Sequence, residues 1–214
     1  MSLSVNYRGV GSASTRLLLK PMTAELEYSL PPAIRRISGA FRRFGWISFW
    51  AQIVLGVIAS LALIFAIASV SSRTGSTDPG AGAGLFFTAI GQVAVFVGAF
   101  WAYRYTRIGR LLRSADDAKR PKPKAAIRIL KIGLFISLGG MLCTLIGAEA
   151  TVGALLAKAL SQPQGAAVFG AGSSVSQYVQ PLDIFIIQAN TNILLAHFVG
   201  LVFTLWTLNS LDNT

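Results

Sequence analysis

The sequence predicts an all-α polytopic membrane protein, with four transmembrane helices preceded by an amphipathic interfacial helix. Hydrophobic residues make up 53% of the 214 residues and charged residues only 13%, whereas a soluble domain carries about a quarter charged residues. The charges are clustered, which leaves apolar runs of about twenty residues, enough to cross a bilayer as helices. The mean hydropathy of +0.60 agrees with this class. The predicted regions are a tail over residues 1–30, an interfacial helix over 31–45 and a transmembrane domain over 46–210, with spans at about 46–70, 85–103, 129–148 and 184–208.

The basic residues lie on alternate sides of the predicted spans. Of nineteen lysines and arginines, seven precede the first span and ten lie from Arg104 to Lys131, between the second and third spans. This is the positive-inside pattern, which places both termini and the 104–128 loop on the cytoplasmic or stromal side. The net charge of +11 is therefore explained without nucleic acid, and the expected partner is a bilayer with anionic lipids.

The first two predicted regions precede the membrane domain. Residues 1–30 have no apolar run that could act as a signal peptide, and we expect a flexible cytoplasmic tail. Its first twenty residues lack acidic groups but are short for a transit peptide, which favours a bacterial protein over an organellar one. The 31–45 segment begins with a helix-start pattern, Ser29-Leu-Pro-Pro, and carries an apolar face opposite Arg35, Arg36, Arg42 and Arg43. Two interpretations stand: a helix lying on the inner leaflet with its arginines toward lipid phosphates, or a docking surface for a partner.

The first two spans have aromatic residues at the expected membrane interface. Trp46 and Trp50 open the first span, and Phe100–Tyr103 close the second. Four arginines then follow at intervals of three residues: Arg104, Arg107, Arg110 and Arg113. The interval resembles a voltage-sensor helix, but these arginines lie beyond the aromatic belt, so we expect a solvated helical extension.

The third span predicts close packing, because small residues repeat along it. Gly133, Ser137 and Gly140, with Gly147, form a groove that another backbone can approach. The span contains Cys143, the single cysteine, which excludes an internal disulfide. It ends near Glu149, and the Gly-, Ser- and Gln-rich residues 161–181 should form an outer loop.

The last span is unusually polar for a transmembrane helix. Asp183, Asn190, His197 and Thr204 are seven residues apart and so form one stripe. Gln188 and Asn192 lie four residues apart on another face. Polar groups in a membrane must face protein, water or a ligand, because lipid offers no hydrogen bonds.

Two interpretations of this stripe remain open. In the first, Asp183 and Glu149 form one mouth of a cation path that continues past Asn190, His197 and Thr204. Carboxylate and imidazole suit Fe(II) or Mn(II), so His197 and Asp183 are candidate ligands of a transported ion, and a proton relay could use the same groups. In the second, the polar residues form interhelical hydrogen bonds, with Gln188 and Asn192 as packing residues. We expect no resident cofactor and no enzyme, since the sequence contains no P-loop, GxSxG or HExxH motif. A pore wall of four spans is thin, which favours a homo-oligomer or a larger membrane complex.

Several motifs resemble one known family. The residues concerned are Leu30-Pro-Pro-Ala-Ile-Arg-Arg, Gly45-Trp-Ile-Ser-Phe-Trp, Gly147-Ala-Glu-Ala, Leu182-Asp-Ile-Phe, Gln188-Ala-Asn-Thr-Asn and Leu195-Ala-His-Phe. They resemble a four-span family of cyanobacteria and plastids, many members of which have no known function. It includes the twenty-one-kilodalton Tic subunit of the chloroplast inner envelope, also named permease in chloroplasts. The resemblance covers roughly residues 31–209 and carries no assigned catalytic residues.

The resemblance implies two functions that belong to different classes. One is transport or homeostasis of a transition metal, iron above all. The other is a non-catalytic assembly or protein-translocon subunit. It also implies a cyanobacterial plasma or thylakoid membrane, or the plastid inner envelope for an organellar protein. We favour metal transport, because a free-living cyanobacterium lacks the plastid import route and the chain shows no clear transit peptide.

Overall fold

The computed structural model describes residues 32–71, 79–114, 121–161 and 181–212. They form four long α-helices: α2 (Pro32–Ser71), α3 (Pro79–Leu111), α4 (Pro123–Ser161) and α6 (Pro181–Asp212). Each helix begins at a proline, which suits the first turn because that position needs no backbone N–H donor. Each contains one predicted span and is long and apolar enough to cross a bilayer. The prediction of an all-α polytopic membrane protein with four spans is confirmed.

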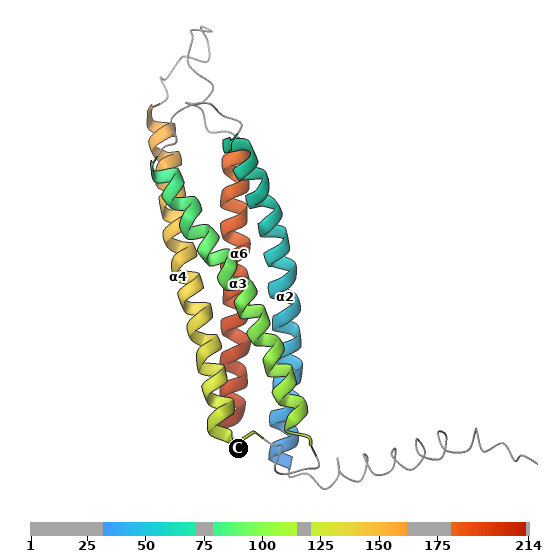
Figure 1. The fold of residues 1–214 in the computed structure, drawn as a ribbon. Helices are drawn as coiled ribbons and strands as arrows, with labels where there is room; N and C mark the ends of the chain where they lie inside the picture. The colour runs from blue at the N-terminus through green and yellow to red at the C-terminus, as the bar shows by residue number, and fades with distance from the viewer. Residues whose placement is uncertain (1–31, 72–78, 115–120, 162–180, 213–214) are drawn as a thin grey trace, which may run out of the picture.

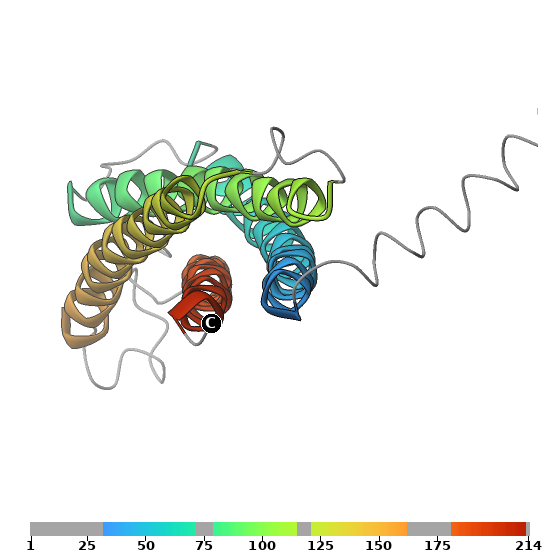
Figure 2. The ribbon, with the colours of Figure 1, turned by 90° about the horizontal axis from the view of Figure 1, so that it is seen from below.

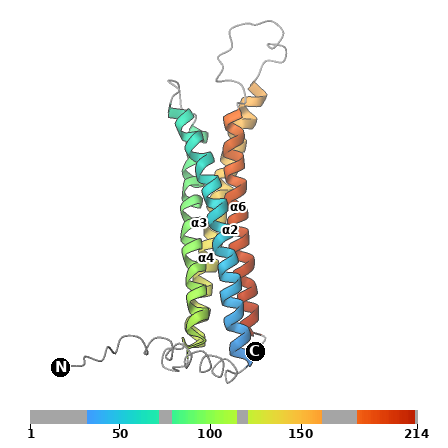
Figure 3. The same ribbon diagram turned by 90° about the vertical axis from the view of Figure 1, so that its right-hand side faces the viewer.

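The helices form one elongated bundle in which successive helices run in opposite directions (Figure 1). The start of α2 and the end of α6 therefore lie at the same end (Figure 3). Seen from that end, α2, α3 and α4 form an arc, and α6 lies on its concave side (Figure 2). Packing follows this arrangement: α6 contacts mainly α2 and α4, and α3 packs between α2 and α4.

Glycines seven residues apart bring α3 and α4 close together. They are Gly84 and Gly91 on α3, and Gly133, Gly140 and Gly147 on α4, whereas Gly98, the next glycine in the α3 series, lies closest to Gln52 of α2. A methyl group on Gly147 would lie 2.9 Å from the carbonyl oxygen of Gly84, and one on Gly84 would lie 3.1 Å from that of Gly147. Only glycine permits such an approach, and a period of seven keeps one stripe against its neighbour in a supercoiled bundle.

The predicted interfacial helix is not a separate element. Residues 32–45 form the first turns of α2, which continues without a break through the first span. The apolar face packs on protein, since Phe41 is fully buried and meets Tyr105 of α3 edge-on at 6.5 Å. Gly45, at the predicted boundary between the interfacial helix and the first span, is a contact point: a methyl there would lie 2.9 Å from the Ala102 carbonyl oxygen. The close contact with α3 keeps this segment on the axis of the span.

The other helices also extend past the predicted spans. α3 continues through Arg104, Arg107 and Arg110 to Leu111, in agreement with a helical extension. α4 continues past Glu149 to Ser161. The predicted tail and the loop residues 162–180 lie outside the described residues. We call the end that holds the start of α2, the end of α3 and the start of α4 the basic end, because twelve of its described residues are Lys or Arg: Arg35, Arg36, Arg42, Arg43, Arg104, Arg107, Arg110, Arg113, Lys122, Lys124, Arg128 and Lys131.

Candidate functional site

The polar stripe of α6 faces the inside of the bundle. Asn190, His197 and Thr204 are 2%, 0% and 3% exposed, so none of these side chains faces lipid. From Asn190 to Thr204 the stripe extends about 21 Å at the helical rise of 1.5 Å per residue. That length is most of a hydrocarbon core about 30 Å thick.

His197 lies where α6 meets both α3 and α4. Its Nε2 is 3.1 Å from the carbonyl oxygen of Gly91 on α3. On α4, a methyl group at Gly140 would collide with Cε1 and Nε2 of the same ring. The imidazole therefore occupies space that exists only because residue 140 has no side chain.

The hydrogen bond to Gly91 determines which nitrogen of His197 carries the hydrogen. A carbonyl oxygen only accepts, so Nε2 donates, and the neutral ring keeps its lone pair on Nδ1. Nδ1 is buried and has no hydrogen-bond partner among the described residues. Such a nitrogen can accept a proton or bind a transition-metal ion.

Asn190 lies one heptad from His197 and links α6 to α3. Its Oδ1 accepts a hydrogen bond of 2.7 Å from Thr88 Oγ1 on α3. A methyl at Gly147 of α4 would lie 2.6 Å from that same hydroxyl oxygen. The Nδ2 of Asn190 has no partner within the described ranges.

Gln52 of α2 also lies in the interior of the bundle. Its Nε2 donates to Ser48 Oγ at 2.8 Å, while its Oε1 is buried and has no partner in the part of the chain that the structure describes. A methyl at Gly200 of α6 would lie 2.9 Å from Gln52 Nε2 and 3.0 Å from Ser137 Oγ of α4. Side chains from α2 and α4 therefore meet against a glycine of α6.

Thr204 ends the buried stripe near the basic end. Its hydroxyl donates to the Gly200 carbonyl oxygen at 2.7 Å, and Tyr105 of α3 hydrogen-bonds with it. Tyr105 itself lies against Gly133 of α4. We call the buried residues that meet along the bundle the polar axis: Asn190, His197, Gln52, Ser137 and Thr204.

Two of the predicted path residues are not placed on this axis. Glu149 is exposed on α4, because it follows the buried Gly147 by two residues and so points about 200° away around the helix. Asp183 lies in the first turn of α6, but its side chain is outside the described residues. No group of three His, Cys, Asp or Glu that could hold a metal occurs within the described residues.

The two residues of the predicted packing pair on α6, Gln188 and Asn192, contact each other. Gln188 Nε2 lies 3.4 Å from Asn192 Oδ1 on the same helix; Gln188 is exposed and Asn192 is 8% exposed. Interhelical hydrogen bonds are made by Gln92 instead, whose Nε2 donates to the Gly56 carbonyl oxygen and to Ser60 Oγ of α2, both at 2.9 Å.

Three residues of the site are not among the candidates predicted from the sequence: Thr88, Gly91 and Tyr105. A signal for them exists in the heptad period: Gly91 is seven residues from Gly84 and from Gly98, and Tyr105 is seven beyond Gly98. Residues with the same seven-residue period on α3 and α4 could have been placed against the polar stripe of α6, and this would have predicted the neighbours of His197.

Comparison with known proteins supports a membrane role for the chain. The family described as "Protein of unknown function (DUF3611)" matches residues 31–212. The chain is similar to "Protein TIC 21, chloroplastic" of Arabidopsis thaliana, with 38% identity over 179 residues that cover 83% of this chain. It spans 58% of the length of that relative. No solved structure matches the chain.

Proposed function

The chain belongs to the DUF3611 family of membrane proteins of unknown function, and we propose that it transports a transition-metal ion, with iron the first candidate and manganese the second. The proposed path follows the polar axis from Asn190 past His197 to Thr204. Asp183 occupies the preceding heptad position of α6 and is the proposed entry ligand. Glu149, exposed near the same end, would attract cations without lining the path.

The observation that carries this proposal is the unpartnered Nδ1 of His197. A packing role needs one ring nitrogen, and Nε2 already fills it by donating to Gly91. The second nitrogen is buried without a partner among the described residues, together with Asn190 Nδ2 and Gln52 Oε1. Unsatisfied polar groups in a bilayer cost several kcal/mol each, and polar residues retained there mark ion or proton pathways.

The polar axis is closed in this structure, because the His197 ring occupies the space next to Gly140 where a side chain would otherwise lie. Transport therefore requires α6 to move relative to α3 and α4.

The proposal is tested by metal uptake into proteoliposomes that contain the full chain. His197→Gln is the informative variant, because its amide N–H can still donate to Gly91 while the imidazole lone pair is lost. We expect Fe(II) and Mn(II) uptake to fall at least about tenfold, which corresponds to about 1.4 kcal/mol of lost stabilisation, with the folded fraction unchanged. Thr191→Val, which alters an exposed hydroxyl of the same helix, is the matched control. Wild-type uptake by a folded His197→Gln protein would refute the path.

A non-catalytic assembly or translocon subunit is the second candidate. It is favoured by the hydrogen bonds that Asn190 and His197 already make to α3, and by the similarity to TIC 21, chloroplastic. In that case the wild-type chain moves no metal in vesicles and copurifies with other membrane proteins as a larger complex. For either function we propose a cyanobacterial plasma or thylakoid membrane, or a plastid inner envelope, with the basic end on the cytoplasmic or stromal side.

A further inference from the structure

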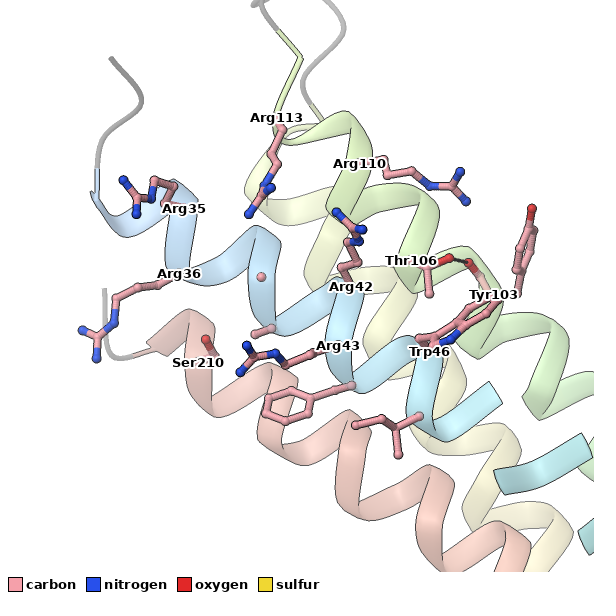
Figure 4. A pocket seen from close by; sticks show the side chains of 14 residues that line it. Arg35, Arg36, Arg42, Arg43, Trp46, Tyr103, Thr106, Arg110, Arg113 and Ser210 are labelled. Carbon is pink, nitrogen blue, oxygen red and sulfur yellow. Dashed lines mark hydrogen bonds between the residues drawn. The ribbon is translucent and has the colours of Figure 1, made fainter. Parts of the chain in front are cut away.

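An open groove of about 1320 Å³ lies at the basic end, away from the polar axis. It runs along α2 and is bordered by α3 and, through Ser210, by α6 (Figure 4). Six arginines line it: Arg35, Arg36, Arg42, Arg43, Arg110 and Arg113. Its floor contains aromatic and apolar groups, Phe44, Trp46, Ile47 and Tyr103.

Close contact between α2 and α3 builds the wall of this groove. A methyl on Gly109 of α3 would lie 2.9 Å from the Ser38 carbonyl oxygen and 3.1 Å from the Arg42 backbone nitrogen. In Figure 4 the Arg42 side chain consequently extends between Arg110 and Arg113. Arg113 Nε donates to Ser38 Oγ at 3.0 Å, which ties the end of α3 to α2.

The lining has a strong excess of positive charge. All its charged members are arginines, and no acidic residue lies in the lining within the described ranges. Placing guanidinium groups side by side is unfavourable because like charges repel. A bound anion relieves this repulsion, and the planar fork of arginine matches phosphate oxygens through paired hydrogen bonds.

The apolar floor identifies the source of the phosphate. Trp46 and Ile47 are 49% and 46% exposed, and Tyr103 is 41% exposed. Trp46 and Ile47 follow Arg42 by about one helical turn, Tyr103 precedes Arg110 by about two turns, and below them the bundle surface is apolar down the spans. Tryptophan and tyrosine prefer the membrane–water interface, so the groove spans the level of the lipid headgroup and the first acyl carbons.

We propose that this groove binds the headgroup phosphate of an anionic phospholipid. Arg42 and Arg110 hold the phosphate, Arg35 and Arg113 border it, and the lipid backbone lies against Trp46 and Tyr103. This site is independent of any transport along the polar axis. It differs from general attraction of a basic surface to a membrane because it requires particular arginines.

The test measures binding of phosphatidylglycerol to the full chain in neutral detergent by native mass spectrometry. Arg42→Gln with Arg110→Gln removes two groove arginines. Arg107→Gln with Arg128→Gln removes the same charge from exposed positions at the same end that are not in the lining. We expect the groove variant to bind at least about tenfold more weakly, since a hydrogen bond to a charged group contributes about 1.5 kcal/mol or more, and the control to stay within about twofold.

Several outcomes would overturn the proposal. Equal losses in the two double variants would indicate diffuse electrostatics rather than a site. Displacement of the lipid by millimolar inorganic phosphate would show that a free phosphate is the ligand. If the groove variant does not fold, Arg42→Lys with Arg110→Lys keeps the charge without the fork geometry. Unchanged binding by that variant, or no enrichment of phosphatidylglycerol on wild-type protein extracted from mixed phosphatidylglycerol and phosphatidylcholine vesicles, would refute it.

Discussion

Adding one methyl group at Gly140 should strongly destabilise the bundle, whereas adding it at the neighbouring Gly139 should not. The Cβ of Gly140→Ala would collide with the His197 ring and approach the Cβ of Ala94 to 2.8 Å. The Cβ of Gly139→Ala would meet nothing within 4 Å. The two variants have the same composition and differ by one position on one helix.

The expected difference follows from packing. Inserting a methyl into a filled interior costs about 1–3 kcal/mol, and here it must displace a ring that is 0% exposed and hydrogen-bonded to Gly91. At Gly139 the exchange gains up to about 0.5–1 kcal/mol, because alanine favours the helix over glycine. This gain applies equally at position 140 and cancels in the comparison, so Gly140→Ala should be about 1–3 kcal/mol less stable than Gly139→Ala.

Reversible unfolding in mixed micelles, followed by far-UV circular dichroism and tryptophan fluorescence, measures this difference. The two unfolding midpoints are compared at a fixed mole fraction of denaturing detergent. Equal midpoints for Gly140→Ala and Gly139→Ala would refute the placement of His197 against α4. A partial rescue of Gly140→Ala by the smaller side chain of His197→Ala would locate the clash in that contact.

Two further predictions concern one interhelical hydrogen bond and the orientation of the bundle. Thr88→Val removes the donor to Asn190 Oδ1 and should lower the free energy of unfolding by about 0.6–2 kcal/mol, as measured by the same unfolding assay; no change would place Asn190 elsewhere. Cysteines introduced at Gly39 and Gly153, where added atoms meet nothing within 4 Å, should react with a membrane-impermeant maleimide from opposite sides in a Cys143→Ser background, with position 39 on the cytoplasmic side. Labelling of both from one side would contradict a single crossing by each of α2, α3 and α4.

The number and order of the spans were predictable because they depend on local quantities. The length of each uncharged run, and which of the connecting loops are basic, can be read directly from the sequence. The separation of an interfacial helix was not predictable, because Gly45 is compatible with either a bend or a contact. Its contact with Ala102 depends on a helix about sixty residues away.

The polar axis also combines features that the local sequence predicts with features that depend on neighbouring helices. A heptad period predicts which residues share a face of α6, and Asn190, His197 and Thr204 do share one. The period says nothing about which neighbour covers that face, so the roles of Thr88 and Gly91 could not be read from α6 alone. Glu149 was assigned by its depth in the membrane, yet its angle from Gly147 already turns it away from the packed face of α4.

The glycine contacts connect the packing of the bundle with its proposed activity. Gly140 leaves the space that the His197 ring occupies, Gly91 lets α3 approach Thr144 and Gly140 of α4, and the Gly91 carbonyl then fixes the hydrogen on Nε2. The close helix approach that stabilises the bundle is thus also what leaves the Nδ1 lone pair inside it. A purely structural residue at this position would need only a donor for Gly91, which glutamine also supplies. For this reason His197→Gln separates packing from transport, whereas a truncation to alanine would disturb both at once.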